Sequence, residues 1–160
     1  MTAVPWLDER EARAWRSMLQ MQMRLTGELA RRLSADSGLS YQDYAVLVAL
    51  TDIPDGRRRL KELGAMLGWE KSRLSHHVTR MADRGLVTKE RCDSDGRGAF
   101  VVVTEHGRSE IEHAAPGHVG AVRELFVDRL RRDQLDTLAD VAEAVLAGLE
   151  PCDDADIEHC

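Results

Sequence analysis

The sequence predicts a mainly α-helical protein that carries one two-stranded β wing. Two observations lead to this fold class. Apolar residues recur every three or four positions over most of the chain, as they do on one face of a helix, and the period changes to two between residues 87 and 103. The chain has 160 residues, of which 43% are hydrophobic, and this is enough for one globular domain with helical extensions.

The first predicted helix covers residues 7–33. Its apolar positions, among them Trp15 and Leu19, are spaced by three and four within a strongly charged background. The polar and glycine-containing segment 34–38 should end it.

Ser40 is followed three residues later by Asp43, which resembles a capping arrangement at the start of a helix. We therefore expect a second helix over residues 44–50. Pro54, Asp55 and Gly56 then predict a turn.

Two short helices follow, with almost no linker between them. Leucine and methionine at spacings of three and four predict a helix over residues 60–67, which Gly68 closes. The next helix covers residues 70–84, and Gly85 lies where a C-terminal cap is expected.

The period then changes from helical to extended. Residues 87–91 alternate and residues 100–103 are β-branched or aromatic, so both segments predict strands, and residues 93–98 have the composition of a hairpin tip. A short helix, a tight turn, a second helix and a hairpin is the element order of a winged helix-turn-helix.

A further helix should begin at Glu105, capped by Thr104, and bend at Pro116. A final amphipathic helix has its apolar positions at Leu135, Leu138, Val141, Val145 and Leu149. Residues 151–160 should form a mobile acidic tail.

The charge distribution separates the middle of the chain from its ends. The net charge is -6, yet residues 57–108 hold twelve basic and seven acidic residues, a net charge of +5. A basic centre between acidic flanks indicates a polyanionic partner more than the total does. No signal peptide and no run of about 20 apolar residues is visible, so we expect a cytoplasmic protein without membrane contact.

The helix over residues 70–84 has the chemistry of a groove-reading helix. Successive residues turn by about 100°, which places Leu74, Val78 and Met81 on one apolar stripe. The opposite face carries only hydrogen-bonding side chains, at Ser72, Arg73, His76, Thr79 and Arg80. Such groups read base edges in the major groove or bind phosphates, although an ordinary solvated helix face can have the same composition.

The hairpin tip places Arg97 between two glycines. A guanidinium presented in this way can enter a narrow minor groove, and Asp95 is close enough in sequence to hold it. The alternative interpretation is a solvated turn with one flexible ion pair.

These segments together resemble the MarR family of transcriptional regulators over roughly residues 7–150. The segments that carry the resemblance are LKEL at 60–63, EKSRLSHHV at 70–78, RGLV at 84–87, DGR at 95–97 and VTEHG at 103–107. The resemblance implies a winged helix-turn-helix at 37–104, flanked by N- and C-terminal dimerisation helices at 1–36 and 105–150. Gly96 and Val103 depart from the family, which usually has arginine and leucine at these positions.

The resemblance also implies roles for individual residues. The family's recognition helix corresponds here to Ser72, Arg73, Ser75, His76, His77 and Arg80, and its wing-tip arginine corresponds to Arg97. With Thr79 and Asp95 these residues form the expected DNA-binding set. The expected dimerisation residues are Trp15, Leu19, Leu135, Leu138 and Val145. The family often binds small aromatic anions, so such an effector is a candidate ligand.

Sensing chemistry is a second interpretation. His106, Glu110 and His113 share one helix face at a spacing that can bind zinc, and oxidation of Cys92 at the base of the wing could tilt Arg97. Cys92, Cys152 and Cys160 are too few and too dispersed for a disulfide framework, so reduced thiols are expected.

No nucleotide-binding, hydrolase or metalloprotease motif occurs, so we expect neither an enzyme nor a cofactor. The sequence therefore predicts a sequence-specific DNA-binding regulator, most simply a repressor that binds an inverted-repeat operator as a homodimer. The alternatives are a redox- or metal-responsive sensor on the same fold, and a winged-helix module that binds an acidic protein.

Overall fold

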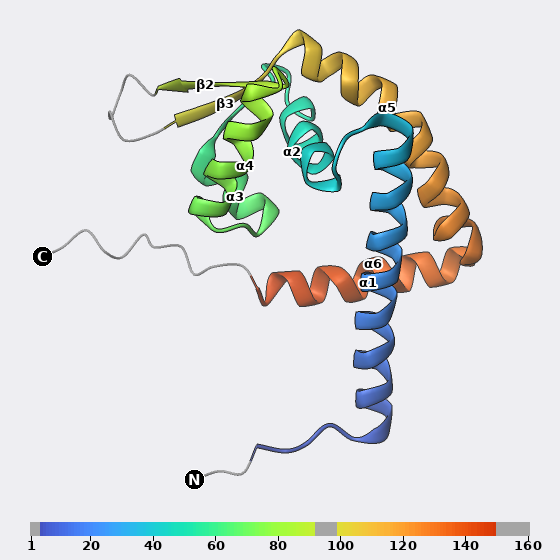
Figure 1. Ribbon diagram of the computed structural model, residues 1–160. Coiled ribbons are helices and arrows are strands. Elements are labelled where there is room, and N and C mark those ends of the chain that lie inside the picture. Colours follow the sequence, from blue (N-terminus) through green and yellow to red (C-terminus); the bar gives the residue numbers. More distant parts are fainter. Residues whose placement is uncertain (1–3, 92–98, 150–160) are drawn as a thin grey trace, which may run out of the picture. The chain divides into compact units, whose positions relative to one another are not determined.

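The computed structural model describes residues 4–91 and 99–149 (Figure 1). The chain divides into two compact units, residues 1–121 and 122–160, and each is described by itself. Across the described ranges, none of the helices combines the length and apolar content that crossing a bilayer requires.

Helix α1 covers Glu9–Ser37 and begins with a capping box. The Asp8 carboxylate accepts from the Glu11 amide, and the Glu11 carboxylate accepts from the Asp8 amide, each at 2.8 Å. The helix continues past its predicted end because the Ser37 hydroxyl donates to the Leu33 carbonyl and Gly38, at φ 71°, makes the C-cap. Only Leu29 and Leu33 of this helix are buried.

Helix α2 covers Tyr41–Thr51 and confirms the predicted capping arrangement. Ser40 Oγ accepts from the Asp43 amide, and Asp43 Oδ2 accepts from the Ser40 amide, both at 3.0 Å. The cap fixes the first helical residue at Tyr41, three positions before the predicted start. Val46, Leu47 and Leu50 are fully buried at the centre of the core.

Helices α3 (Leu60–Leu67) and α4 (Lys71–Asp83) confirm the predicted pair. Gly68 closes α3 at φ 64°, and Gly85 follows α4 at φ 72°, a region that glycine enters without a Cβ penalty. The apolar stripe of α4 packs into the core, with Leu74, Val78 and Met81 completely buried.

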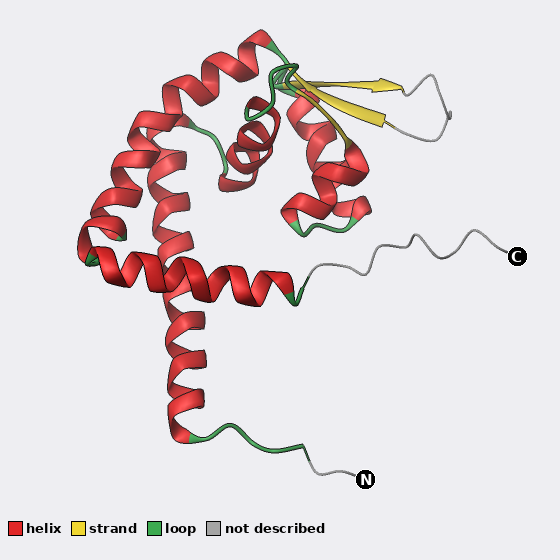
Figure 2. Ribbon diagram, turned by 180° about the vertical axis from the view of Figure 1, so that it is seen from behind, coloured by secondary structure: helices red, strands yellow, loops and turns green. Residues whose placement is uncertain are grey.

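The sheet has three strands instead of the predicted two. Strands β2 (Val87–Arg91) and β3 (Ala99–Val103) pair antiparallel as expected, from Val87 opposite Val103 to Arg91 opposite Ala99. Strand β1 (Arg57–Arg59) pairs with the other edge of β3, giving the order β1-β3-β2 (Figure 2). Three consecutive arginines show no alternation, so the sequence could not predict this strand.

Helix α5 covers Glu105–Leu125 and begins as predicted. Thr104 Oγ1 accepts from the Gly107 amide at 2.9 Å. Pro116 lies inside the helix, which remains continuous but curves along its length (Figure 2). At Gly107 the helix passes so close to the Leu86 carbonyl that a Cβ would overlap it. This contact ties the start of α5 to the chain that enters the wing.

The second unit contains a short 3₁₀ turn at Val127–Arg129 and helix α6 at Arg132–Ala147. Helix α6 has no buried residue: Val141 and Val145 are more than half exposed, and Leu135 and Leu138 are half-buried.

Candidate nucleic-acid interface

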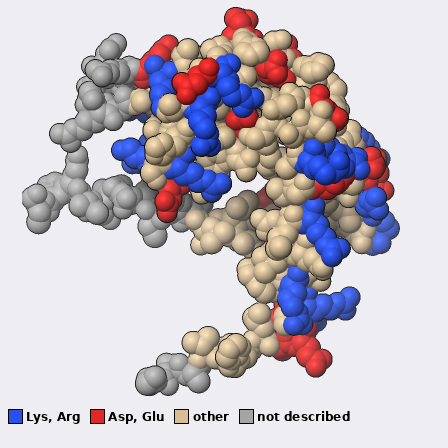
Figure 3. Space-filling model, in the orientation of Figure 1, with Lys and Arg blue, Asp and Glu red and all other residues tan. Residues whose placement is uncertain are grey.

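The polar face of α4 is open to solvent. Five of its side chains are exposed on the side opposite the buried stripe: Ser72, Arg73, His76, Thr79 and Arg80. Lysine and arginine side chains gather over α4 and the neighbouring strands (Figure 3). The structure therefore places on one exposed face of α4 the five residues that helix geometry predicted there.

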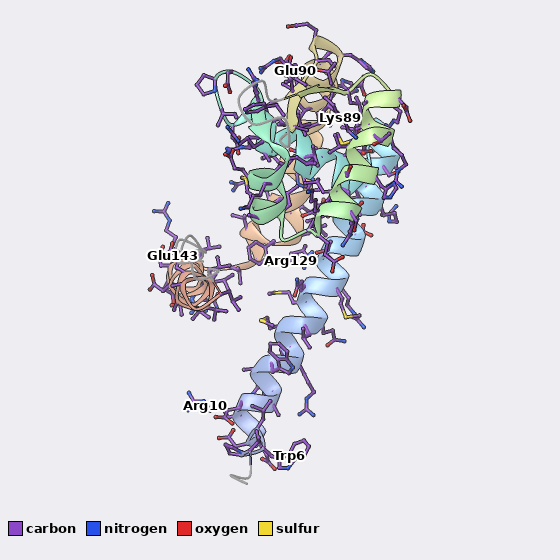
Figure 4. All side chains as sticks on the ribbon, turned by 90° about the vertical axis from the view of Figure 1, so that its left-hand side faces the viewer. Trp6, Arg10, Lys89, Glu90, Arg129 and Glu143 are labelled. Atoms are coloured by element: carbon purple, nitrogen blue, oxygen red, sulfur yellow. The ribbon has the colours of Figure 1, made fainter. Side chains whose placement is uncertain are left out.

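Lys89 of β2 joins this face, and the sequence interpretation missed it. Its Nζ donates to Thr79 Oγ1 at 2.6 Å and to the Ser75 carbonyl at 3.3 Å, so it lies against the middle of α4. Figure 4 labels Lys89 on the strand beside this helix. Residues two apart on a strand point to the same side, so Lys89 points to the same side of β2 as the buried Val87. The alternation of residues 87–91 could therefore have predicted that Lys89 lies on this side of the strand.

Behind this face lies a buried carboxylate. Asp43 is only 3% exposed, and its Oδ2 accepts from Arg84 Nη1 at 2.7 Å and from the Ser40 amide at 3.0 Å. Burial alone raises the pKa of Asp43, but the contacts from His77, Arg84 and Ser40 outweigh burial and hold this pKa well below its ordinary value. Asp43 is therefore a fixed negative charge that links α2 to α4.

His77 differs from its neighbours on α4, because it is buried and only 8% exposed. Its Nε2 lies 3.0 Å from Asp43 Oδ1, an electrostatic contact that does not meet the geometry of a hydrogen bond. Its Nδ1 lies 3.1 Å from Arg80 Nη2. A guanidinium only donates, so Nδ1 is the acceptor and the proton belongs on Nε2, facing the carboxylate. The structure thus places His77 beneath the exposed face, unlike the other expected recognition residues.

Trp69 completes the group below α4. Its ring meets the His77 ring edge to face, with centroids 5.4 Å apart. The Arg73 guanidinium lies 5.0 Å from the Trp69 ring centroid, within cation–π range. A pocket of about 470 Å³ opens here, lined by Ser40, Gln42, Asp43, Trp69, Arg73, His77, Arg80 and Arg84. Three guanidinium groups around one buried carboxylate leave the lining net positive.

Other predicted sites are less complete. Asp95, Arg97 and Cys92 lie outside the described residues, as do Cys152 and Cys160. His106 Nδ1 is 3.9 Å from Glu110 Oε1, but His113 does not join them. Within residues 4–91 and 99–149 no three histidine, cysteine or carboxylate side chains are grouped to hold a metal ion.

Comparisons with known proteins identify the family. The family model described as "MarR family" matches residues 37–98. The chain is 38% identical to AbsC, a MarR family transcriptional regulator from Streptomyces coelicolor, over 91% of this chain and 98% of that one, with a TM-score of 0.86. It is 37% identical to Sco3205, a MarR family regulator of the same organism in complex with DNA, over 95% of each chain, with a TM-score of 0.89.

A more distant structural match is CouR from Rhodococcus jostii RHA1 bound to p-coumaroyl-CoA. It is 21% identical over 80% of this chain and 87% of that one, with a TM-score of 0.69. A comparison with curated proteins gives no match. The identity to AbsC and Sco3205 over nearly their whole length shows that this chain belongs to the MarR family of DNA-binding transcriptional regulators.

Proposed function

We propose that this regulator is a repressor that binds an inverted-repeat operator as a homodimer, with α4 in the major groove and the tip between β2 and β3 in the minor groove. The observation that carries the proposal is the continuous donor surface formed by the exposed face of α4 and by Lys89. Arginine can bind guanine with two hydrogen bonds, and serine, threonine and histidine can reach bases or phosphates.

The expected DNA contacts divide into two kinds. Arg73 and Arg80 are candidates for reading bases, because both are exposed arginines on the outer side of α4. Ser72, Ser75, His76 and Thr79 are candidates for base or phosphate contacts on the same helix. Lys89 is a candidate phosphate ligand, because an ammonium group is a point charge without a fixed fork geometry. Arg97 and Asp95 retain their predicted role at the wing tip.

The homodimer is supported by apolar side chains that the single chain leaves uncovered. On α1, Trp15 is 53% exposed and Leu19 is 37% exposed. On α6, Val145 is 57% exposed. Large apolar side chains repeated along one helix favour burial against another surface, and a second copy of the chain is the simplest partner. Trp15, Leu19, Leu135, Leu138 and Val145 remain the proposed dimerisation residues.

The proposed function includes a small-molecule effector. CouR is bound to p-coumaroyl-CoA, an aromatic and anionic ligand. We propose a small aromatic or anionic molecule as the class of effector for this chain, and we expect no cofactor and no enzymatic activity.

Selection of bound sequences from a random duplex pool tests the function. We expect an inverted repeat whose half-site centres are about one helical turn apart, and a protein that light scattering measures as a dimer at micromolar concentration. A selected site without twofold symmetry, or a monomer under these conditions, would contradict the proposal.

A further inference from the structure

The two exposed arginines of α4 are each held by a side chain that lies deeper in the protein. Arg80 Nη2 donates to His77 Nδ1 at 3.1 Å, and Arg73 lies over the Trp69 ring at 5.0 Å. His77 and Trp69 in turn contact each other edge to face. Neither arginine therefore projects as an isolated, freely rotating side chain.

His77, which binds Arg80, lies against the carboxylate of Asp43, and the position of this carboxylate is fixed by other contacts. Asp43 Oδ1 lies beside His77 Nε2, and Asp43 Oδ2 accepts hydrogen bonds from Arg84 and from the Ser40 amide. A negative charge beside Nε2 favours the ring form that carries its proton there. This ring form leaves the Nδ1 lone pair free to accept from Arg80.

We propose that Asp43, His77 and Trp69 form a positioning cluster that holds Arg80 and Arg73 in the orientations in which they meet DNA. The proposal rests on the function proposed above and extends it to residues that do not touch the nucleic acid. A side chain that is already ordered loses less rotamer freedom on binding, so prearrangement raises affinity for the fitting sequence. His77 thus acts through Arg80, and Trp69 acts through Arg73.

The two arms of the cluster can be separated by substitution. His77→Phe keeps a ring against Trp69 but removes the Nδ1 acceptor and the Nε2 donor, so it should release Arg80 alone. Trp69→Leu keeps an apolar side chain but removes the aromatic face, so it should release Arg73. His113→Phe is the matched control, because His113 is an exposed histidine on α5.

A double-mutant cycle on DNA affinity distinguishes positioning from a general structural role. With the duplex that the wild-type protein selects, His77→Phe should weaken binding about fivefold, but by less than twofold when Arg80 is already alanine. Trp69→Leu should behave in the same way with Arg73→Ala. His113→Phe should match the wild type. Equal losses in both backgrounds, or no loss from either cluster variant, would overturn the inference.

Arginine side-chain NMR of the free wild-type protein gives a readout that needs neither DNA nor a variant. The guanidinium N–H groups of Arg80 should show slow rotation and reduced mobility compared with those of the exposed Arg10 on α1. Signals of Arg80 that average like those of Arg10 would overturn the positioning of Arg80, even if the His77→Phe protein did not fold.

The outcomes separate the inference from the proposed function. If the wild-type protein selects a defined sequence but the cycle is additive, the positioning cluster is wrong and the DNA-reading function stands. If the wild-type protein selects no sequence, the proposed function is wrong, and the inference that Asp43, His77 and Trp69 position arginines for DNA is wrong with it.

Discussion

Arg84 donates to Asp43 across 41 residues of sequence, with 2.7 Å between Nη1 and Oδ2. The bond joins the residue that ends α4 to the first turn of α2. Asp43 also belongs to the capping box of α2, where a negative charge is favourable beside the unpaired amides of the helix start. One carboxylate thus stabilises the start of one helix and fixes the position of another.

Replacing this carboxylate should destabilise the protein in a pH-dependent way. We expect Asp43→Asn to lower the free energy of unfolding by about 2 kcal/mol at pH 7, because charged hydrogen bonds to a buried group are lost while the half-exposed Arg84 remains partly solvated. The pKa of Asp43 is depressed below its ordinary value of 3.8. Its stabilisation is therefore complete above that value and is lost as the pH falls through the folded pKa.

Urea unfolding of Asp43→Asn and wild-type protein over a pH series measures this difference. The gap between them should stay constant from pH 7 to 5 and narrow below about 3.8. The exposed Asp140→Asn is the control and should follow the wild type. An Asp43→Asn protein as stable as the wild type at pH 7 would contradict the structural role of the carboxylate.

Two glycines of α5 should respond oppositely to alanine. At Gly107 a Cβ would overlap the Leu86 carbonyl, whereas at Gly120 nothing lies within 4 Å. We expect Gly107→Ala to cost about 1 to 3 kcal/mol and Gly120→Ala to stabilise by about 0.5 to 1 kcal/mol through helix propensity. Thermal unfolding compares the two. Similar effects of both substitutions would argue against the close approach at Gly107.

His118 should make stability fall in mildly acidic solution. Its ring lies 4.5 Å from that of Tyr44, its Nδ1 is buried without a hydrogen-bond partner, and burial lowers its pKa from 6.5. Below about pH 6.5 the unfolded chain then binds more protons than the folded one, so stability decreases as the pH falls toward the folded pKa.

The substitution His118→Phe should flatten this decrease, which melting temperatures between pH 7.5 and 5 would reveal. The exposed His113→Phe should keep the slope of the wild type. A slope that is the same in all three proteins would show that His118 titrates normally.

Substitution of Arg73 and of Arg97 should affect DNA binding in different ways. Arg73→Ala should lose a bidentate contact with a base, which should weaken the binding free energy for the preferred half-site by about 1 to 3 kcal/mol and relax the sequence preference at that position. Arg97→Ala should weaken binding most where the flanking sequence is A·T-rich, because a narrow minor groove attracts arginine. Titration against four duplexes, with correct or altered half-sites and A·T or G·C flanks, tests both. Equal weakening on all four would indicate simple phosphate neutralisation.

Local signals in the sequence predicted much of the fold. Helix caps and helix ends involve residues only a few positions apart, so the sequence shows them directly. Examples are the cap formed by Ser40 and Asp43, the cap at Thr104 and the helix ends at Gly68 and Gly85. The buried stripe of α4 follows from helix geometry alone.

The remaining features depend on contacts between distant segments. Strand β1 exists because β3 offers a free edge and Phe100 lies under Arg57, at 3.9 Å from ring centroid to guanidinium carbon. His77 lies about 300° around the helix from Leu74, at the border of the apolar stripe, and its burial depends on contacts with Asp43 of α2 and with Trp69, which precedes α4. Lys89 reaches α4 only after the hairpin folds back on it.

Titration of the full-length protein against its selected duplex and a scrambled duplex of equal length, over a range of salt concentrations, tests most directly whether α4 reads DNA sequence. We expect the logarithm of affinity to fall linearly with the logarithm of salt for both duplexes, with the selected duplex bound at least about 1,000-fold more tightly at physiological salt. Equal affinity for the two duplexes, or affinity that does not change with salt, would contradict sequence-specific binding through this face.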